Sequence, residues 1–112
     1  MIEPRLASDI HVKAIRRIAE AQGNFASVLY RGDPVSGSIL IAARKRSDIP
    51  VIYERFGAMD GNSKWQESGP KDSRSEQDVT DWLKKRRARD PDIWAIELDI
   101  ASDEQLADFI AG

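Results

Sequence analysis

Residues 82–99, WLKKRRARDPDIWAIELD, contain the end of a helix, an enforced stop and a buried strand. Pro91 lacks an amide hydrogen and disfavours the α conformation in the preceding residue, so the helix must end at or before Asp90. Beyond the turn, alternate residues fall on opposite faces of a strand: Trp94, Ile96 and Leu98 on one, and Ile93, Ala95 and Glu97 on the other. A strand that is apolar on one face and mixed on the other is expected in or near the centre of a sheet.

The residues before this stop predict a helix over about 75–89. Val79, Trp82 and Leu83 recur at the i, i+3, i+4 spacing of one helix face. We expect this face to dock on the same hydrophobic interior as the Trp94 face of the following strand. The stem of Arg86 can cover apolar surface while its guanidinium stays in water.

The rest of the chain supplies one helix and four short strands before this segment. The first helix is predicted to begin at Ser8 or Asp9 and to run to about Gln22. Strands are predicted at 25–30, 38–43, 51–56 and 64–67, and the first two are expected to pair as a hairpin across a loop. A last helix is predicted at 102–111.

This order of elements predicts an α+β fold. Hairpin connections imply an antiparallel sheet of about five strands, made of a four-strand meander and one later strand. About three helices are expected to cover the sheet in a two-layer arrangement. Residues 1–112 are the length of a single domain.

Composition excludes several kinds of chemistry. The chain has no cysteine, so disulfides, thiolate nucleophiles and cysteine-bound metal sites are impossible. His11 is the only histidine, which excludes a multi-histidine metal site within one chain. The formal net charge is −2, which argues against a protein that coats nucleic acid. The sequence shows no apolar export signal and no membrane span, so a cytoplasmic location is expected.

Two groups of residues invite a catalytic or metal-binding interpretation. Asp90, Asp92, Glu97 and Asp99 could bind a hard cation such as Mg²⁺. These carboxylates are divided between the two ends of one strand, so we favour turn and surface roles and expect no metal and no cofactor. His11 lies on the apolar side of the first helix, where a structural role at the edge of the core is favoured over a catalytic one.

The basic residues near the end of the second helix are the better candidate site. Their members are Lys84, Lys85, Arg87 and Arg89, and a second cluster consists of Arg44, Lys45 and Arg46. If the fold brings the clusters together, they could grip phosphates of a nucleic acid. A solvated helix end, whose cations complement the helix dipole, explains the second-helix residues without a ligand and is favoured.

Several motifs together resemble one protein family. RGDPVSGSILI at 31–41, Trp65 after a turn, and RRARDPDIWAIELD at 86–99 are similar to the alphaproteobacterial family known as domain of unknown function 1491. The resemblance spans nearly the whole chain. It implies a core position for His11, because family members often carry an aromatic residue there, and it brings no assigned activity.

The leading hypothesis is therefore a cytoplasmic, non-enzymatic domain that acts through protein–protein contacts, with a protein partner or as a homo-oligomer. One alternative is nucleic-acid binding through the basic helix end at 84–89. Another is a small-molecule enzyme that uses carboxylates with Tyr53 or Tyr30, and His11 as an outside candidate. No membrane partner is expected.

Overall fold

The computed structural model describes residues 7–46, 48–57, 63–72, 74–102, 104 and 105. Its elements follow the chain as α1 (Ser8–Ala21), β1 (Phe25–Tyr30), β2 (Ile39–Lys45), β3 (Val51–Gly57), β4 (Ser63–Ser68), α2 (Glu76–Arg89) and β5 (Trp94–Ile100). These bounds confirm the two predicted helices and five predicted strands to within a few residues. The last predicted helix, at 102–111, lies mostly outside the described residues.

The five strands form one mixed sheet in the order β1-β5-β2-β3-β4. The last strand, β5, lies between β1 and β2: it pairs antiparallel with β1 and parallel with β2. The β2–β3 and β3–β4 pairs are antiparallel, as predicted. The expected hairpin between the first two strands, and with it the purely antiparallel sheet, is therefore wrong.

The composition of β5 explains why it takes an interior place. Its even-numbered residues from Trp94 to Ile100 are buried on one face, while Ile93 and Ala95 are buried on the other. A strand with one fully apolar face and further apolar residues at the start of the other is stabilised where neighbouring elements cover these residues and both backbone edges are paired. An interior place between two strands meets both conditions, which an edge position could not.

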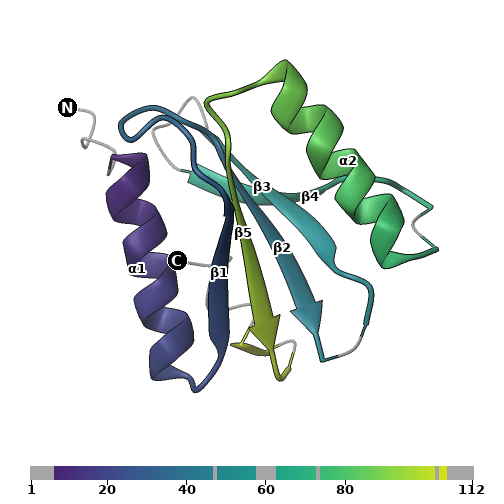
Figure 1. The fold of residues 1–112 in the computed structure, drawn as a ribbon. Coiled ribbons are helices and arrows are strands. Elements are labelled where there is room, and N and C mark those ends of the chain that lie inside the picture. The colour runs from purple at the N-terminus through teal and green to yellow at the C-terminus, as the bar shows by residue number, and fades with distance from the viewer. Residues whose placement is uncertain (1–6, 47, 58–62, 73, 103, 106–112) are drawn as a thin grey trace.

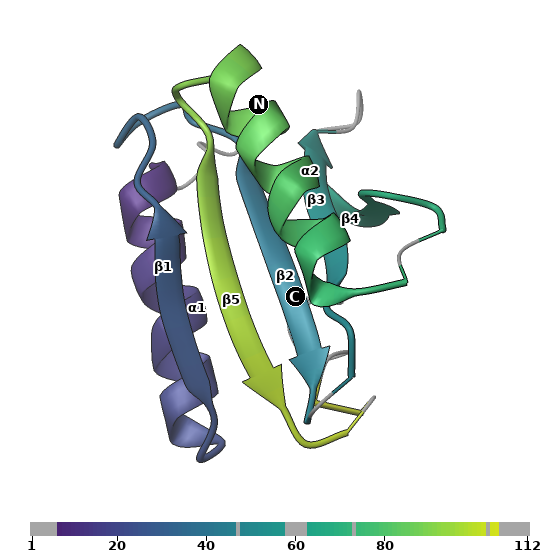
Figure 2. The ribbon, with the colours of Figure 1, turned by 45° about the vertical axis from the view of Figure 1, so that its right-hand side comes forward.

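The two described helices lie on opposite faces of the sheet (Figures 1 and 2). Val12, Ile15 and Ala19 of α1 pack against the Trp94 face of β5, and α2 packs against the other face, where Ala95 lies. The predicted two-layer arrangement is therefore wrong, and the described residues form two helices instead of about three. The expectation that both tryptophans, Trp82 and Trp94, share one interior is wrong as well. The alternation within a strand was right, but periodicity does not say on which side a helix will dock.

Neither α1 nor α2 has the length and apolar character that a membrane-crossing helix requires, and no other described segment does.

An ion pair anchors α2 to the sheet. Arg86 donates two hydrogen bonds to the carboxylate of Glu54 on β3, from Nη1 to Oε1 at 2.6 Å and from Nη2 to Oε2 at 2.8 Å. The hydrogen bonds to Glu54 and its negative charge raise the pKa of Arg86, although burial opposes them. The prediction that this guanidinium stays in water is wrong, because the sequence did not show that Glu54 would face α2.

The loop between β1 and β2 docks on the turn that precedes β5. The Asp33 amide donates to the carbonyl of Asp92 at 2.9 Å, and the Trp94 indole donates to the carbonyl of Asp33 at 2.8 Å. The Asp33 carboxylate accepts hydrogen bonds from the amides of Val35 and Ser36, an Asx turn that lowers its pKa. The residues of the RGDP sequence thus form a turn, and the backbone bonds of Asp33 hold the loop at 31–37 against the turn at 90–92.

Gly32 is required for this contact. A Cβ atom at this position would lie 2.0 Å from the backbone oxygen of Asp92, closer than any non-bonded contact allows. We expect Gly32→Ala to lower the free energy of unfolding by about 2 kcal/mol, as overpacking against rigid backbone does. Urea unfolding measures this, with Gly23→Ala, a position with open space around its Cβ and a positive φ, as a comparison for backbone strain alone. Equal losses in the two variants would contradict the packing explanation.

Candidate functional site

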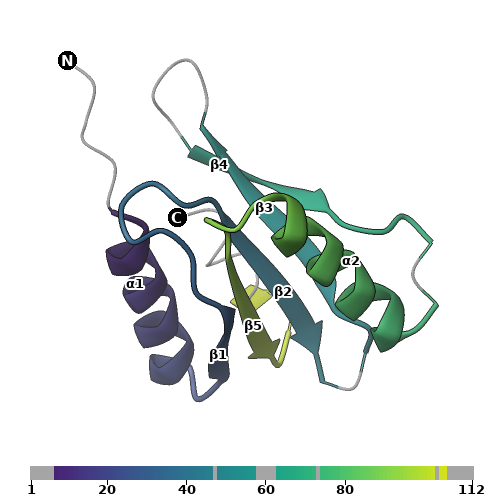
Figure 3. The same cartoon turned by 45° about the horizontal axis from the view of Figure 1, so that its top comes forward.

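The sheet face on the α2 side is only partly covered. Helix α2 lies over β2 and β3, and β1 lies at the far edge of the sheet (Figures 2 and 3). On this uncovered part, Phe25 is 75% exposed and Leu29 is 41% exposed. Large apolar side chains on an open sheet face beside an edge strand mark a candidate interaction surface.

A β-bulge in β1 adds to this surface. The pairing with β5 shifts between Val28 and Tyr30, so Leu29 is an extra residue on the β1 side. Leu29 and Tyr30 line the same hollow of about 310 Å³, together with Val79 and Leu83 of α2. The bulge therefore places two consecutive apolar residues on the open face, where regular alternation would place one.

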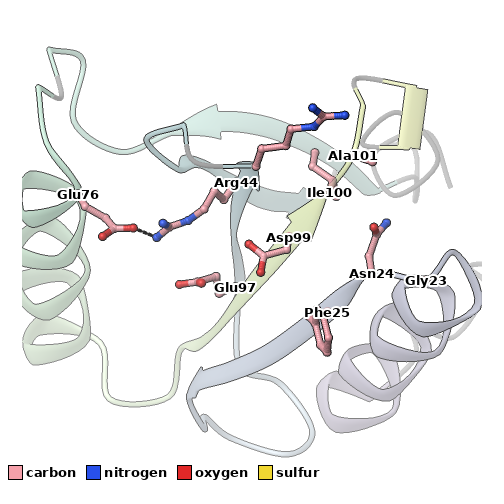
Figure 4. Close-up of a pocket in the computed structure, with 10 residues that line it drawn as sticks. Gly23, Asn24, Phe25, Arg44, Glu76, Glu97, Asp99, Ile100 and Ala101 are labelled. Atoms are coloured by element: carbon pink, nitrogen blue, oxygen red, sulfur yellow. Dashed lines mark ion pairs between the residues drawn. The ribbon is translucent and has the colours of Figure 1, made fainter.

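A wider trough of about 780 Å³ continues from this hollow toward the other end of β5. Arg44 reaches from β2 to an ion pair with Glu76 at the start of α2, and the carboxylates of Glu97 and Asp99 lie between Arg44 and β1 (Figure 4). Phe25, the first residue of β1, borders the trough on the β1 side. The trough thus has charged residues of both signs along its floor and an apolar residue, Phe25, at its border.

The trough lacks a recognisable acid–base set. Within the described residues, the side chains of Glu97 and Asp99 have no hydrogen-bond or ion-pair partner that would orient them for proton transfer. His11 and Tyr53 lie on the opposite face of the sheet, which α1 covers. No group of three metal-ligating side chains occurs among the residues described. The predicted carboxylates Asp90 and Asp92 lie before β5, while Glu97 and Asp99 lie near its end.

His11 belongs to a cluster between α1 and the far strands of the sheet. Its Nδ1 accepts a hydrogen bond from Arg55 of β3, and its ring meets that of Trp65 of β4 edge to face, with centroids 6.0 Å apart. Burial, assisted by the charge of Arg55, lowers the pKa of His11 to about 4. This arrangement supports the structural role that was expected for His11.

The lowered pKa of His11 makes stability depend on pH. The unfolded chain binds a proton at His11 near pH 6.5 but the folded chain only near pH 4, so stability is lost as the pH falls through this window. We expect His11→Phe to lose less stability than the wild type between neutral pH and about pH 5. Urea unfolding of both proteins at the two pH values measures the difference. Parallel losses would show that His11 stays accessible to protons in the folded state.

The structure does not join the two basic clusters into one patch. Arg44 lies by Glu76 at the start of α2, whereas Lys84, Lys85, Arg87 and Arg89 belong to its last turns, and a 14-residue helix is ~21 Å long. Lys45 and Arg46 follow Arg44 at the end of β2 and beyond it.

Arg87 already has a structural role at the end of α2. It donates to the carbonyls of Arg31 and Ile93 and lies over the ring of Tyr30. Lys84, Lys85 and Arg89 are exposed and unpaired within the part of the chain that the structure describes. Nucleic-acid binding stays an untested prediction.

The feature that sequence reasoning missed is the β1 edge. FASVLY was predicted as a strand, but nothing in its letters said that it would lie at the border of the sheet. The signal available in the sequence was its composition: FASVLY has apolar residues on both faces and no charged residue. That pattern is compatible with a buried strand and equally with an edge strand whose second face is open to another protein.

Comparisons with known proteins agree with this fold. The sequence matches the family described as protein of unknown function (DUF1491) over residues 6–108. The crystal structure of a DUF1491 family protein from Caulobacter crescentus CB15 is 31% identical, with a TM-score of 0.75, and the match covers 88% of this chain and 91% of that chain. No curated protein matches the chain.

Two further solved structures resemble the chain. The NMR structure of a DUF1491 family protein from Caulobacter crescentus CB15 is 33% identical, with a TM-score of 0.69, over 84% of each chain. The solution structure of Atu0922 from A. tumefaciens shares the fold at 23% identity, with a TM-score of 0.73, over 91% of this chain and 92% of that chain. The resemblance read from the RGDPVSG and DPDIW motifs is confirmed.

Proposed function

Because this chain belongs to the DUF1491 family of proteins of unknown function, we propose that it is a non-enzymatic cytoplasmic domain, spanning 1–112, that binds another protein chain along the edge of β1. The character of β1 as an apolar edge strand carries the proposal. β1 contains no charged residue, has no strand on its outer side within the described sheet, and leaves Phe25 75% exposed.

The two edges of the sheet differ in a way that supports this proposal. An edge strand presents unpaired amides and carbonyls, and natural proteins usually protect it with charges, proline or a covering element. The β4 edge contains a lysine and a glutamate, Lys64 and Glu67. The β1 edge, FASVLY, contains no charge and no proline. An apolar edge without charge or proline favours aggregation in a protein that works alone and favours binding in a protein that pairs with another chain.

The expected mode of binding is strand addition. In this mode the main chain of the partner supplies hydrogen bonds to the edge, and its alternate side chains pack on the sheet face. The open face beside β1 provides Phe25 and Leu29 for that packing. The register of the β1–β5 ladder is regular from Phe25 to Val28 and shifts before Tyr30, so we expect regular pairing with a partner strand to extend no further than Leu29.

The alternatives have less support. An enzyme that uses carboxylates would need an oriented acid or base, and the trough carboxylates are not oriented by any described neighbour. A nucleic-acid site would need the basic clusters on one surface, and α2 separates them by its own length. Neither objection applies to a contact along β1.

Photo-crosslinking in cells tests the proposal. A photoreactive amino acid replaces Ser27, an exposed residue in the middle of β1, and the matched control replaces Gln66, an exposed residue in the middle of β4. We expect a protein adduct at position 27 and little or none at 66, with the crosslinked chain identified by mass spectrometry. No adduct at position 27, or equal adducts at both positions, would remove the proposal.

A further inference from the structure

We propose that the chain bound at β1 is a second copy of the same protein, paired antiparallel so that Ser27 of one copy lies opposite Ser27 of the other. The two sheets then join into one continuous sheet about a two-fold axis. This inference rests on the proposed function, because it names the partner of the same edge. It is carried by the arrangement of side chains about the middle of β1.

The faces of β1 restrict the register of such a pair. Phe25 and Leu29 both line the hollows on the α2 face, whereas Ala26 and Val28 pack against the α1 core. Residues directly opposite each other in an antiparallel pair point to the same face of the sheet. In a two-fold pair, the axis must therefore pass through a residue of β1 and not between two residues. Otherwise residues of the buried face of one copy would lie opposite residues of the open face of the other.

Among the registers that meet this condition, the one centred on Ser27 matches the exposed apolar side chains. It places Phe25 of each copy opposite Leu29 of the other on the open face, and Ala26 opposite Val28 on the α1 face. Moving the centre by one residue, to Ala26 or Val28, breaks the pairing of Phe25 with Leu29. The two large apolar residues that β1 exposes, Phe25 and Leu29, lie two residues before and two residues after Ser27, which is the symmetry that a two-fold contact requires.

The chemistry of β1 favours self-pairing. With no charge in FASVLY, two copies meet without like-charge repulsion. Two Phe25–Leu29 contacts would bury side chains that are now 75% and 41% exposed. A pair of serines at the axis can hydrogen-bond to each other. A contact confined to one strand is small, below the ~1,200 Å² of stable interfaces, so we expect dimers that dissociate on dilution.

Disulfide trapping tests the register. The chain has no cysteine, so Ser27→Cys introduces a single thiol. Opposed residues have Cα atoms about 4.5–5.5 Å apart, within the range that a disulfide spans. We expect Ser27→Cys to form a covalent dimer under mild oxidation much faster than Gln66→Cys, in the middle of the other edge strand. Equal rates for the two variants would overturn the register.

Sedimentation equilibrium tests the dimer without any crosslink. We expect the average mass of the wild type to rise with concentration and that of Phe25→Asp to stay at the monomer value. Thermal melts should show Phe25→Asp folded, because the side chain it replaces is mostly in solvent. A wild type that is monomeric at every concentration would overturn the second-copy assignment. The β1-edge proposal would then survive only if the photo-crosslink at position 27 captured a different protein.

Discussion

Replacing Arg86 with Met is expected to lower the free energy of unfolding by about 3 kcal/mol, because it leaves a buried carboxylate without its partner. The side chain of Glu54 is 8% exposed and that of Arg86 is 21% exposed. Both carboxylate oxygens accept hydrogen bonds from the guanidinium, so the variant loses the charge balance and both bonds at once. Urea unfolding at neutral pH measures the loss.

The double variant separates the cost of the lone charge from the value of the pair. Replacing a buried pair by apolar residues is often nearly neutral, so Glu54→Leu with Arg86→Met should recover to within about 1 kcal/mol of the wild type. Lys85→Met is the control for losing a neighbouring cation on an exposed part of α2, and it should change stability by no more than ~0.5 kcal/mol. If Arg86→Met cost as little as this control, the pair would not hold α2 on the sheet.

Shortening Ile96 to Ala should cost about 3 kcal/mol, in the range for large-to-small changes in a rigid core. Ile96 is 0% exposed and lies in β5 between Val28 of β1 and Ile41 of β2. Its side chain packs in the buried cluster that α1 covers, so the shorter side chain is expected to leave a cavity there. Thermal and urea unfolding both measure this loss.

The same change at an exposed isoleucine gives the comparison. Ile18 of α1 is 42% exposed, so Ile18→Ala removes the same atoms with little loss of burial and gains helix propensity. We expect its effect to stay well below that of Ile96→Ala. Similar losses in the two variants would mean that β5 is not the buried interior strand.

The secondary structure was largely predictable because its signals are local. Pro91 ends α2, alternation marks β5, and glycine, proline and aspartate mark the loops. Such signals depend on a few neighbouring residues and on backbone chemistry, so they are readable without the rest of the chain. The resemblance to the DUF1491 family was readable for the same reason, since its motifs are short and continuous.

The strand order was not predictable from these signals. The loop at 31–38 between β1 and β2 is compatible with a hairpin and also with a connection that passes over one inserted strand, because the extra strand adds only about 4.8 Å. The choice depends on β5, which lies more than 60 positions later in the chain and buries one entire face, from Trp94 to Ile100. The strand order therefore depends on residues that lie far from this loop in the sequence.

The candidate site followed from the same long-range choice. Once β5 takes the interior place, β1 becomes an edge and Phe25 and Leu29 are left on an open face. The residues proposed from the sequence as a binding surface were all charged, because charge density is visible in a sequence while exposure is not. Arg86 illustrates the same limit. It belongs to a run of cations that were expected to be solvated, yet its side chain is largely buried against Glu54.

Amide hydrogen exchange of β1 in the isolated protein tests most directly whether its outer edge takes another chain. In dilute solution, alternate amides of Phe25–Tyr30 should exchange quickly because they point away from β5, and the others should be protected by the β1–β5 ladder. In concentrated solution, the fast amides should become protected while those of β4 do not change. Full protection of β1 at every concentration, or fast amides that stay fast both in concentrated protein and with a captured partner, would contradict the account.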